Sequence, residues 1–223
     1  MIKTDSLQLT HQSLGFFSNK TKDRILISSL VLFNEGGFNN VTTASIAKRT
    51  GILEGSLWYH FNTKKDILSN HIQLLENVFI SVNQQIKSKK FETIINEFFN
   101  SYNIIWDFRY ILRDNFQKSF EDDESISKSI KEINNFLDKW AENKILHSHE
   151  SGLIKINSKE IENLSEIILV IGRYWLDFSM KKYPDVNISS LRLKGLKHIV
   201  TVLSPYLNPE GIPTIENMLK QLK

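Results

Sequence analysis

Residues 42–61 combine the residue types that a small DNA-binding unit needs. Thr42 suits the N-cap of a short helix, because its hydroxyl can accept the backbone N–H near Ser45. Gly51 supplies the left-handed backbone of a sharp turn, and Ile52 would fill the gap between two helices. The pattern predicts a helix-turn-helix whose second helix fits the DNA major groove. An ordinary helical corner shows the same alanine-to-glycine spacing, so that spacing alone does not decide.

Further motifs occur in a fixed order on both sides of this segment. They are Thr21-x-x-Arg-Ile-Leu, Leu32-Phe33-x-Glu-x-Gly-Phe38, Thr42-x-x-x-Ile-Ala47, Gly51-Ile52, Gly55-Ser56-Leu57-Trp-Tyr-His60-Phe61 and Thr63-Lys64-x-Asp66-x-Leu68. In order and spacing, residues 21–70 resemble without gaps the N-terminal domain of the TetR family of bacterial transcription regulators. Trp58 departs from the family's usual tyrosine, and Leu53 and Glu54 stand where a small polar and often a basic residue are usual.

The resemblance implies a role for individual residues of this head. Three of them would grip phosphates: Thr42, Trp58 and Lys64. Others would lie at or near the groove surface: Ala44, Gly55, Ser56, Tyr59 and His60. Thr43, Lys48 and Glu54 are further candidates for DNA binding. Physically, Gly55 allows a close backbone approach and Lys64 begins a helix whose free N–H groups attract phosphate. His60 has an equally good alternative role, which is to fill space beside Phe61.

Glu54 has two possible effects on DNA binding. Its charge could weaken nonspecific attraction to phosphates, or its carboxylate could accept a hydrogen bond from a cytosine amino group. On either side of Lys64, Thr63 and Asp66 have the spacing of a capping box at a helix start.

Arginine among aromatic residues marks a second cluster later in the chain. The segments 106–114 and 172–177 resemble stretches found in one branch of the family. A pocket for an anionic or amphipathic effector would use Trp106, Arg109, Tyr110, Arg113, Trp140, Arg173 and Tyr174. The alternative, which we favour, is an aromatic core with internal ion pairs. Those pairs would join Arg173 to Asp177, and Asp107 or Asp114 to a neighbouring arginine.

Motifs of enzymes and metal centres are missing. The chain has no cysteine, G-x-G-x-x-G, Walker phosphate loop or G-x-S-x-G elbow. His147, His149 and Glu150 form the one cluster with metal-ligand character, but residues two apart do not share a helix face. We read this cluster as a polar helix end, and we expect no catalysis, cofactor or metal.

The elements that must position these residues are helices. All four prolines follow residue 183, and apolar residues recur with a period of 3.6. We expect an all-α chain with helices near 22–35, 43–49, 54–60, 64–87, 91–106, 108–118, 125–147, 158–182 and 188–203, and a last one after Thr214. Three domains are expected: a flexible arm at 1–19, a helix-turn-helix head at 20–70, and an effector-binding and dimerisation body at 71–223.

Charge supports a polyanion partner for the head. The net charge is +3, all of it within residues 1–71. No stretch has the length and hydropathy of a signal peptide or membrane helix, so we expect a soluble, cytoplasmic protein without a membrane partner.

Together these observations predict a homodimer that binds double-stranded DNA at a palindromic operator and releases it when a small-molecule effector binds. The resemblance implies that the last two long helices pair with their copies. Two apolar stripes would form that interface: Leu164, Ile168, Ile171, Trp175 and Phe178, and Leu191, Leu196, Ile199, Val200 and Leu203. The competing hypothesis is a ligand-binding or interaction protein of the same fold that has lost DNA binding.

Overall fold

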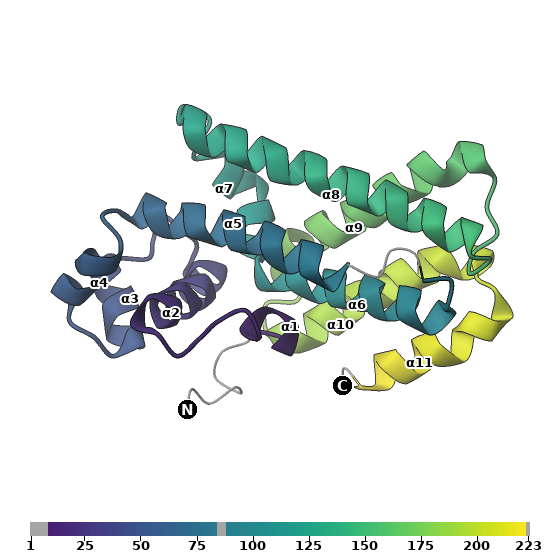
Figure 1. Ribbon diagram of the computed structural model, residues 1–223, viewed down its shortest axis with the longest axis horizontal. Coiled ribbons are helices and arrows are strands. Elements are labelled where there is room, and N and C mark those ends of the chain that lie inside the picture. The colour runs from purple at the N-terminus through teal and green to yellow at the C-terminus, as the bar shows by residue number, and fades with distance from the viewer. Residues whose placement is uncertain (1–8, 84–87, 222–223) are drawn as a thin grey trace. The chain divides into compact units, whose positions relative to one another are not determined.

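The computed structural model describes residues 9–83 and 88–221, in which the secondary structure is helices joined by turns and loops, with one isolated bridge between Ile154 and Leu207 (Figure 1). The first half holds α1 (His11–Leu14), α2 (Thr21–Gly36), α3 (Thr43–Thr50), α4 (Glu54–His60), α5 (Lys64–Val82) and α6 (Phe91–Asp107). The second half holds η2 (Arg109–Leu112), α7 (Asp114–Lys118), α8 (Glu124–Glu150), η3 (Ser158–Glu160), α9 (Ile161–Lys182), α10 (Ile188–Leu203), η4 (Ser204–Tyr206), η5 (Pro209–Gly211) and α11 (Ile212–Gln221). The all-α prediction is confirmed. Within the described residues, no helix has the length and hydropathy to cross a membrane.

Two predicted helices differ from the structure. The helix expected at 108–118 is broken into η2 and α7, because Arg113 adopts an extended backbone with ψ of 136°. All four residues of η2, Arg109 included, are buried. The pattern of polar and apolar residues therefore does not mark the position of the break. The helix expected at 64–87 runs to Val82, and residues 84–87 lie outside the described part.

The described part of the N-terminal arm, residues 9–19, contains the short helix α1 and buried side chains, whereas the prediction for residues 1–19 is a flexible arm. Leu9, Thr10 and Ser13 are buried. The backbone N–H and the hydroxyl of Thr10 both donate to Asp107 Oδ2, at 3.0 and 2.5 Å. A buried carboxylate therefore holds the start of α1, which short-range sequence patterns could not reveal. Residues 1–8 lie outside the described part.

The chain divides into two compact units that do not follow one boundary in the sequence. Unit 1 extends to Ser81 and resumes over Asn103–Lys131, and unit 2 takes Val82–Tyr102 and the chain from Glu132 onward. The helix-turn-helix segment thus shares its unit with α5, η2 and α7. Both α6 and α8 contribute residues to the two units.

A polar network lies inside the apolar core of unit 1. His71 is fully buried, and its Nε2 lies 2.9 Å from the carbonyl of Leu26, so this nitrogen donates. Nδ1 then accepts from the Tyr110 hydroxyl at 2.8 Å. Burial lowers the pKa of His71 to about 4, because the charged ring would lose its hydration.

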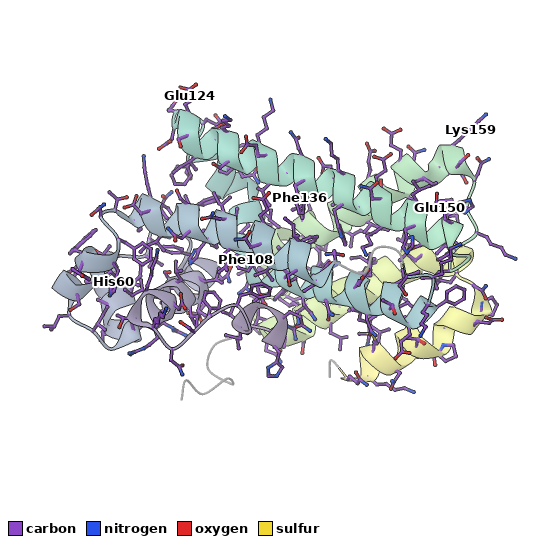
Figure 2. All side chains as sticks on the ribbon, in the orientation of Figure 1. His60, Phe108, Glu124, Phe136, Glu150 and Lys159 are labelled. Atoms are coloured by element: carbon purple, nitrogen blue, oxygen red, sulfur yellow. The ribbon has the colours of Figure 1, made fainter. Side chains whose placement is uncertain are left out.

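A single asparagine fastens α2 to the corner between α6 and η2. Asn34 Nδ2 donates to the carbonyl of Asp107 at 2.7 Å, and Asn34 Oδ1 accepts from the backbone N–H of Tyr110 at 3.1 Å. Both ends of the side-chain amide are therefore satisfied. Beside this corner, Phe108 is fully buried and is labelled in Figure 2.

Helices α9 and α10 pack on each other within unit 2. The two stripes that we had assigned to a dimer interface are mostly buried within the chain, including Leu164, Ile168, Leu191 and Leu196. For these buried residues the interface prediction is wrong, because they supply intrachain core, whereas Phe178 of the same prediction is 52 % exposed. Gly195 permits the close crossing, since a Cβ there would lie 2.3 Å from Trp175 Cδ1.

Candidate nucleic-acid interface

Helix α3 begins and ends as the sequence predicts. The hydroxyl of Thr42 accepts from the backbone N–H of Ser45 at 3.1 Å, which confirms the N-cap. Gly51 closes the helix in the left-handed region at φ +74°. Ile46 and Ala47 are buried at 0 and 2 % exposure, so the opposite face of α3 is left to solvent. A tether that sequence reasoning missed is Arg24 Nη2, which donates to the carbonyl of Thr50 at 2.5 Å.

Helix α4 buries one side and exposes the rest. Leu57 and Phe61 are buried, while Trp58 and Tyr59 are 41 and 87 % exposed. Residues 54–56 are exposed as well, and His60, labelled in Figure 2, is half-buried. Figure 1 shows α4 beside α3, with α5 leaving from its end. The arrangement offers carboxylate, hydroxyl and aromatic groups on a short helix of the width that a major groove admits.

A side-chain contact joins the two helices. The hydroxyl of Thr43 donates to Glu54 Oε1 at 2.5 Å. One carboxylate oxygen of Glu54 is therefore engaged within the protein, and the other remains to accept from a partner. The predicted groove residues Ala44 and Lys48 are exposed on the neighbouring helix.

Lys64 holds the turn before α3 as well as beginning α5. Its Nζ donates to the carbonyls of Phe38 and Val41 at 2.7 and 3.0 Å, and it lies 4.4 Å from the centroid of the Phe38 ring. Partial burial lowers the pKa of this amine. Two of its three N–H groups are thus used internally, which leaves one for a phosphate. The composition of the sequence gives no sign of these two carbonyl contacts.

The capping box at the start of α5 is confirmed. The backbone N–H of Thr63 donates to Asp66 Oδ2 at 3.0 Å, and the backbone N–H of Asp66 donates to Thr63 Oγ1 at 3.1 Å. This reciprocal pair of hydrogen bonds fixes the backbone at the start of α5, from which the Lys64 side chain extends.

The first three predicted effector residues, two of which lie in η2, belong to the core of unit 1. Trp106, Arg109 and Tyr110 are at most 2 % exposed. Arg109 Nη1 donates to the carbonyl of Trp106 at 3.0 Å, and its guanidinium lies 5.7 Å from the centroid of that indole. Arg113 is half-buried at the end of η2. These contacts fit the core alternative.

The remaining predicted effector residues lie in unit 2 and are also partnered or exposed. Trp140 Nε1 donates to Asn83 Oδ1 at 3.1 Å. Arg173 forms its ion pair with Asp138 of α8, at 2.9 Å, whereas we had expected Asp177. Tyr174 is 50 % exposed. His147 and His149 fall within α8, and the described residues contain no group of three potential metal ligands.

An apolar cavity lies elsewhere in unit 2, and none of the seven predicted effector residues lines it. Its volume is about 40 Å³, enough for a few water molecules. Apolar side chains of α6, α8, α10 and α11 form its wall, joined by Lys144 and Ser148. Lys144 forms a buried ion pair with Glu97, whose other oxygen, Oε1, has no hydrogen-bond partner among the described residues. The sequence signal for this cavity is Lys144, a lysine on the apolar face of the helix α8.

Comparison with protein families decides the classification. The model for bacterial regulatory proteins of the tetR family matches residues 25–70, and the model for the TetR bacterial transcriptional repressor matches residues 73–214. The chain belongs to the TetR family. It is a DNA-binding transcription regulator, and α3 and α4 lie within the segment that matches the tetR N-terminal model.

Individual TetR relatives cover most of the chain. The negative transcriptional regulator IcaR of the biofilm operon icaADBC, from Staphylococcus aureus strain Newman, is 25 % identical over 186 residues, which span 78 % of this chain and 92 % of IcaR. A solved TetR-family regulator from Marinobacter aquaeolei VT8 has a TM-score of 0.69 and 25 % identity, covering 92 % of this chain and 99 % of that one. The ketosteroid regulator KstR2 of Mycobacterium tuberculosis shares the fold, with a TM-score of 0.61 and 18 % identity over 86 % of this chain and 97 % of KstR2.

Proposed function

We propose that this TetR regulator represses transcription as a homodimer on a palindromic operator, and that a small-molecule effector releases it. The observation that carries the proposal is the surface of α4, where buried Leu57 anchors the helix and all its other residues except half-buried His60 are exposed. IcaR, which is named as a negative regulator, supports repression as the direction of control.

The DNA contacts divide by chemistry. Thr42, Trp58 and Lys64 bind phosphates, Trp58 through an indole N–H that can only donate. Base edges and their surroundings are contacted by Thr43, Ala44, Lys48, Glu54, Gly55, Ser56, Tyr59 and His60. Exposure of Tyr59 at 87 % supports this role, because a tyrosine so open in the free protein gains most from burial in a groove.

An exposed apolar face of α9 supports the dimer. Ile167, Val170, Tyr174 and Phe178 are 46–54 % exposed and recur at the spacing of one helix face. This face, which keeps Phe178 of the predicted interface, is the candidate interface in place of the buried stripe residues. Light scattering at micromolar concentration should give the mass of a dimer, and Phe178→Asp should give a monomer. Ile212→Asp, at another exposed apolar position, should leave the dimer intact.

The apolar cavity of unit 2 is the candidate effector site. The helices α6 and α8 that line it also carry residues of unit 1, so a ligand that moves them would act on both units. At about 40 Å³ the cavity must widen to admit more than a few waters, which couples binding to a conformational change. A compound that co-purifies with the protein should weaken operator binding. Equal affinity for free and operator-bound protein would rule out this release mechanism.

Operator binding itself is tested with the full chain and duplex DNA from upstream of its own gene. Fluorescence anisotropy should show saturable binding that a shuffled duplex of the same composition does not match. Equal binding to both duplexes would favour the competing hypothesis, in which the chain keeps the fold without sequence-specific DNA binding.

A further inference from the structure

Two large apolar side chains stand out in the described chain, and both belong to the recognition segment. Tyr59 is 87 % exposed and Leu53 is 80 % exposed, whereas the next most exposed large apolar side chain, Val170, reaches 54 %. A single exposed leucine is common on protein surfaces. An almost fully exposed leucine at the N-terminal end of a recognition helix is placed where base edges are read.

The backbone around Leu53 is fixed, so this exposure is built into the helix start. Leu53 is the N-cap residue of α4, with φ −72° and ψ 148°, and its carbonyl accepts from the backbone N–H groups of Ser56 and Leu57. Its side chain forms no cap hydrogen bond. The neighbouring Ile52 is half-buried. Leu53 therefore gives up the hydrogen bond that a serine could make there, and it leaves most of its apolar side chain in solvent.

The negative charge of Glu54 indicates that the partner of Leu53 is a base edge, because a carboxylate repels the phosphates of the DNA backbone. Glu54 follows directly, and Thr43 holds one of its oxygens at 2.5 Å. The carboxylate therefore stays near Leu53 and disfavours approach of the DNA backbone at this end of α4. Among the groups that a major groove presents, the 5-methyl of thymine is the apolar one.

We propose that Leu53 contacts the 5-methyl group of one thymine in each operator half-site and selects thymine at that position. The inference rests on the proposed operator binding by α4. Contact between the leucine side chain and the methyl group would remove apolar surface of both from water. A uracil at the same position keeps every hydrogen-bonding group of thymine and lacks only this methyl.

Uracil substitution is therefore the test. The full-length protein first selects its preferred duplex from a random-sequence pool, and each thymine of a half-site is then replaced by deoxyuridine, one position at a time. One position should lose affinity by about fourfold in one half-site and about fifteenfold when both half-sites are changed. With Leu53→Ser, the usual type of residue in the family, thymine and uracil should bind alike at that position.

Tyr59→Ala is the matched control, because it truncates the other highly exposed side chain of the same helix. With Tyr59→Ala, the operator position assigned to Leu53 should still lose affinity when its thymine is replaced by uracil. If Leu53→Ser retains the sensitivity and Tyr59→Ala abolishes it, the assignment to Leu53 is wrong. Sequence-specific binding with no uracil-sensitive thymine would also overturn it while leaving operator binding intact. Failure to select any preferred duplex would instead overturn the proposed operator binding itself.

Discussion

Helix α4 and the segment 106–112 contain similar residue types with opposite exposure. Both combine aromatic rings with charged or polar groups, yet Tyr59 is 87 % exposed and Tyr110 is 1 % exposed. Tyr110 reaches the buried His71, while Tyr59 has the neighbouring His60 ring at 5.2 Å. Aromatic and charged residues therefore mark a binding surface only where the helix has a single buried side. Where every side is covered, the same residues form core.

Truncation of the two tyrosines should separate the regions most strongly. Tyr110→Ala is expected to lower the free energy of unfolding by roughly 3–5 kcal/mol, because it leaves a cavity and an unpaired His71 nitrogen. Tyr59→Ala should change it by less than about 0.5 kcal/mol. Urea unfolding followed by circular dichroism measures both. Similar losses of unfolding free energy for the two variants would contradict the assignment of Tyr110 to the core and Tyr59 to the surface.

Acid should destabilise the buried region through His71. Its pKa is about 4 in the folded chain and 6.5 in the unfolded one, so the unfolded chain binds the extra proton between these values. The contribution of neutral His71 to the free energy of unfolding is complete above pH 6.5. It is lost as the pH falls toward 4, by about 3 kcal/mol in total. His71→Gln should flatten this part of the profile by one proton. An unchanged profile would show that His71 is not buried as a neutral ring.

Replacement of Tyr59 should affect DNA binding alone. We expect Tyr59→Ala to weaken operator binding by roughly 1–3 kcal/mol and to relax the preference at one position of each half-site. Anisotropy titrations against a set of single-position operator variants would show both effects. Weaker binding with an unchanged preference would reassign Tyr59 to the DNA backbone.

The smallest expected effect belongs to Lys64. Lys64→Ala should weaken binding to all sequences alike and reduce the salt slope by about 1 per subunit. Lys90→Ala removes the same charge in unit 2 and should leave the slope unchanged. A Lys64 variant that altered the preferred bases and kept the salt slope would contradict the phosphate role.

Local signals in the sequence predict the head well. The Thr42 cap, the turn at Gly51 and the Thr63–Asp66 capping box depend on neighbours within a few residues, and the structure has all three. The helices of the body follow from apolar periodicity, which also depends on short spacing. The contacts of Lys64 with Phe38 and Val41 join residues more than twenty positions apart, so no local pattern announces them.

The body shows where such reasoning fails. A period of 3.6 identifies a buried face without saying what covers it. The family resemblance places the stripes of α9 and α10 against a second copy, whereas most of their residues are buried within this chain, where α9 and α10 pack on each other. The exposed face of α9, from Ile167 to Phe178, became recognisable only once the intrachain core was known. The apolar cavity likewise gathers side chains from four helices.

Hydroxyl-radical oxidation of side chains, read by mass spectrometry with and without operator, tests the central contrast directly. In the free protein Trp58 and Tyr59 should oxidise rapidly, and Trp106 and Tyr110 slowly. Operator DNA should protect Trp58 and Tyr59 and leave the other two unchanged, whereas a nonspecific duplex should protect far less. Equal oxidation of Tyr59 in the presence and absence of operator would contradict α4 as the DNA-reading surface.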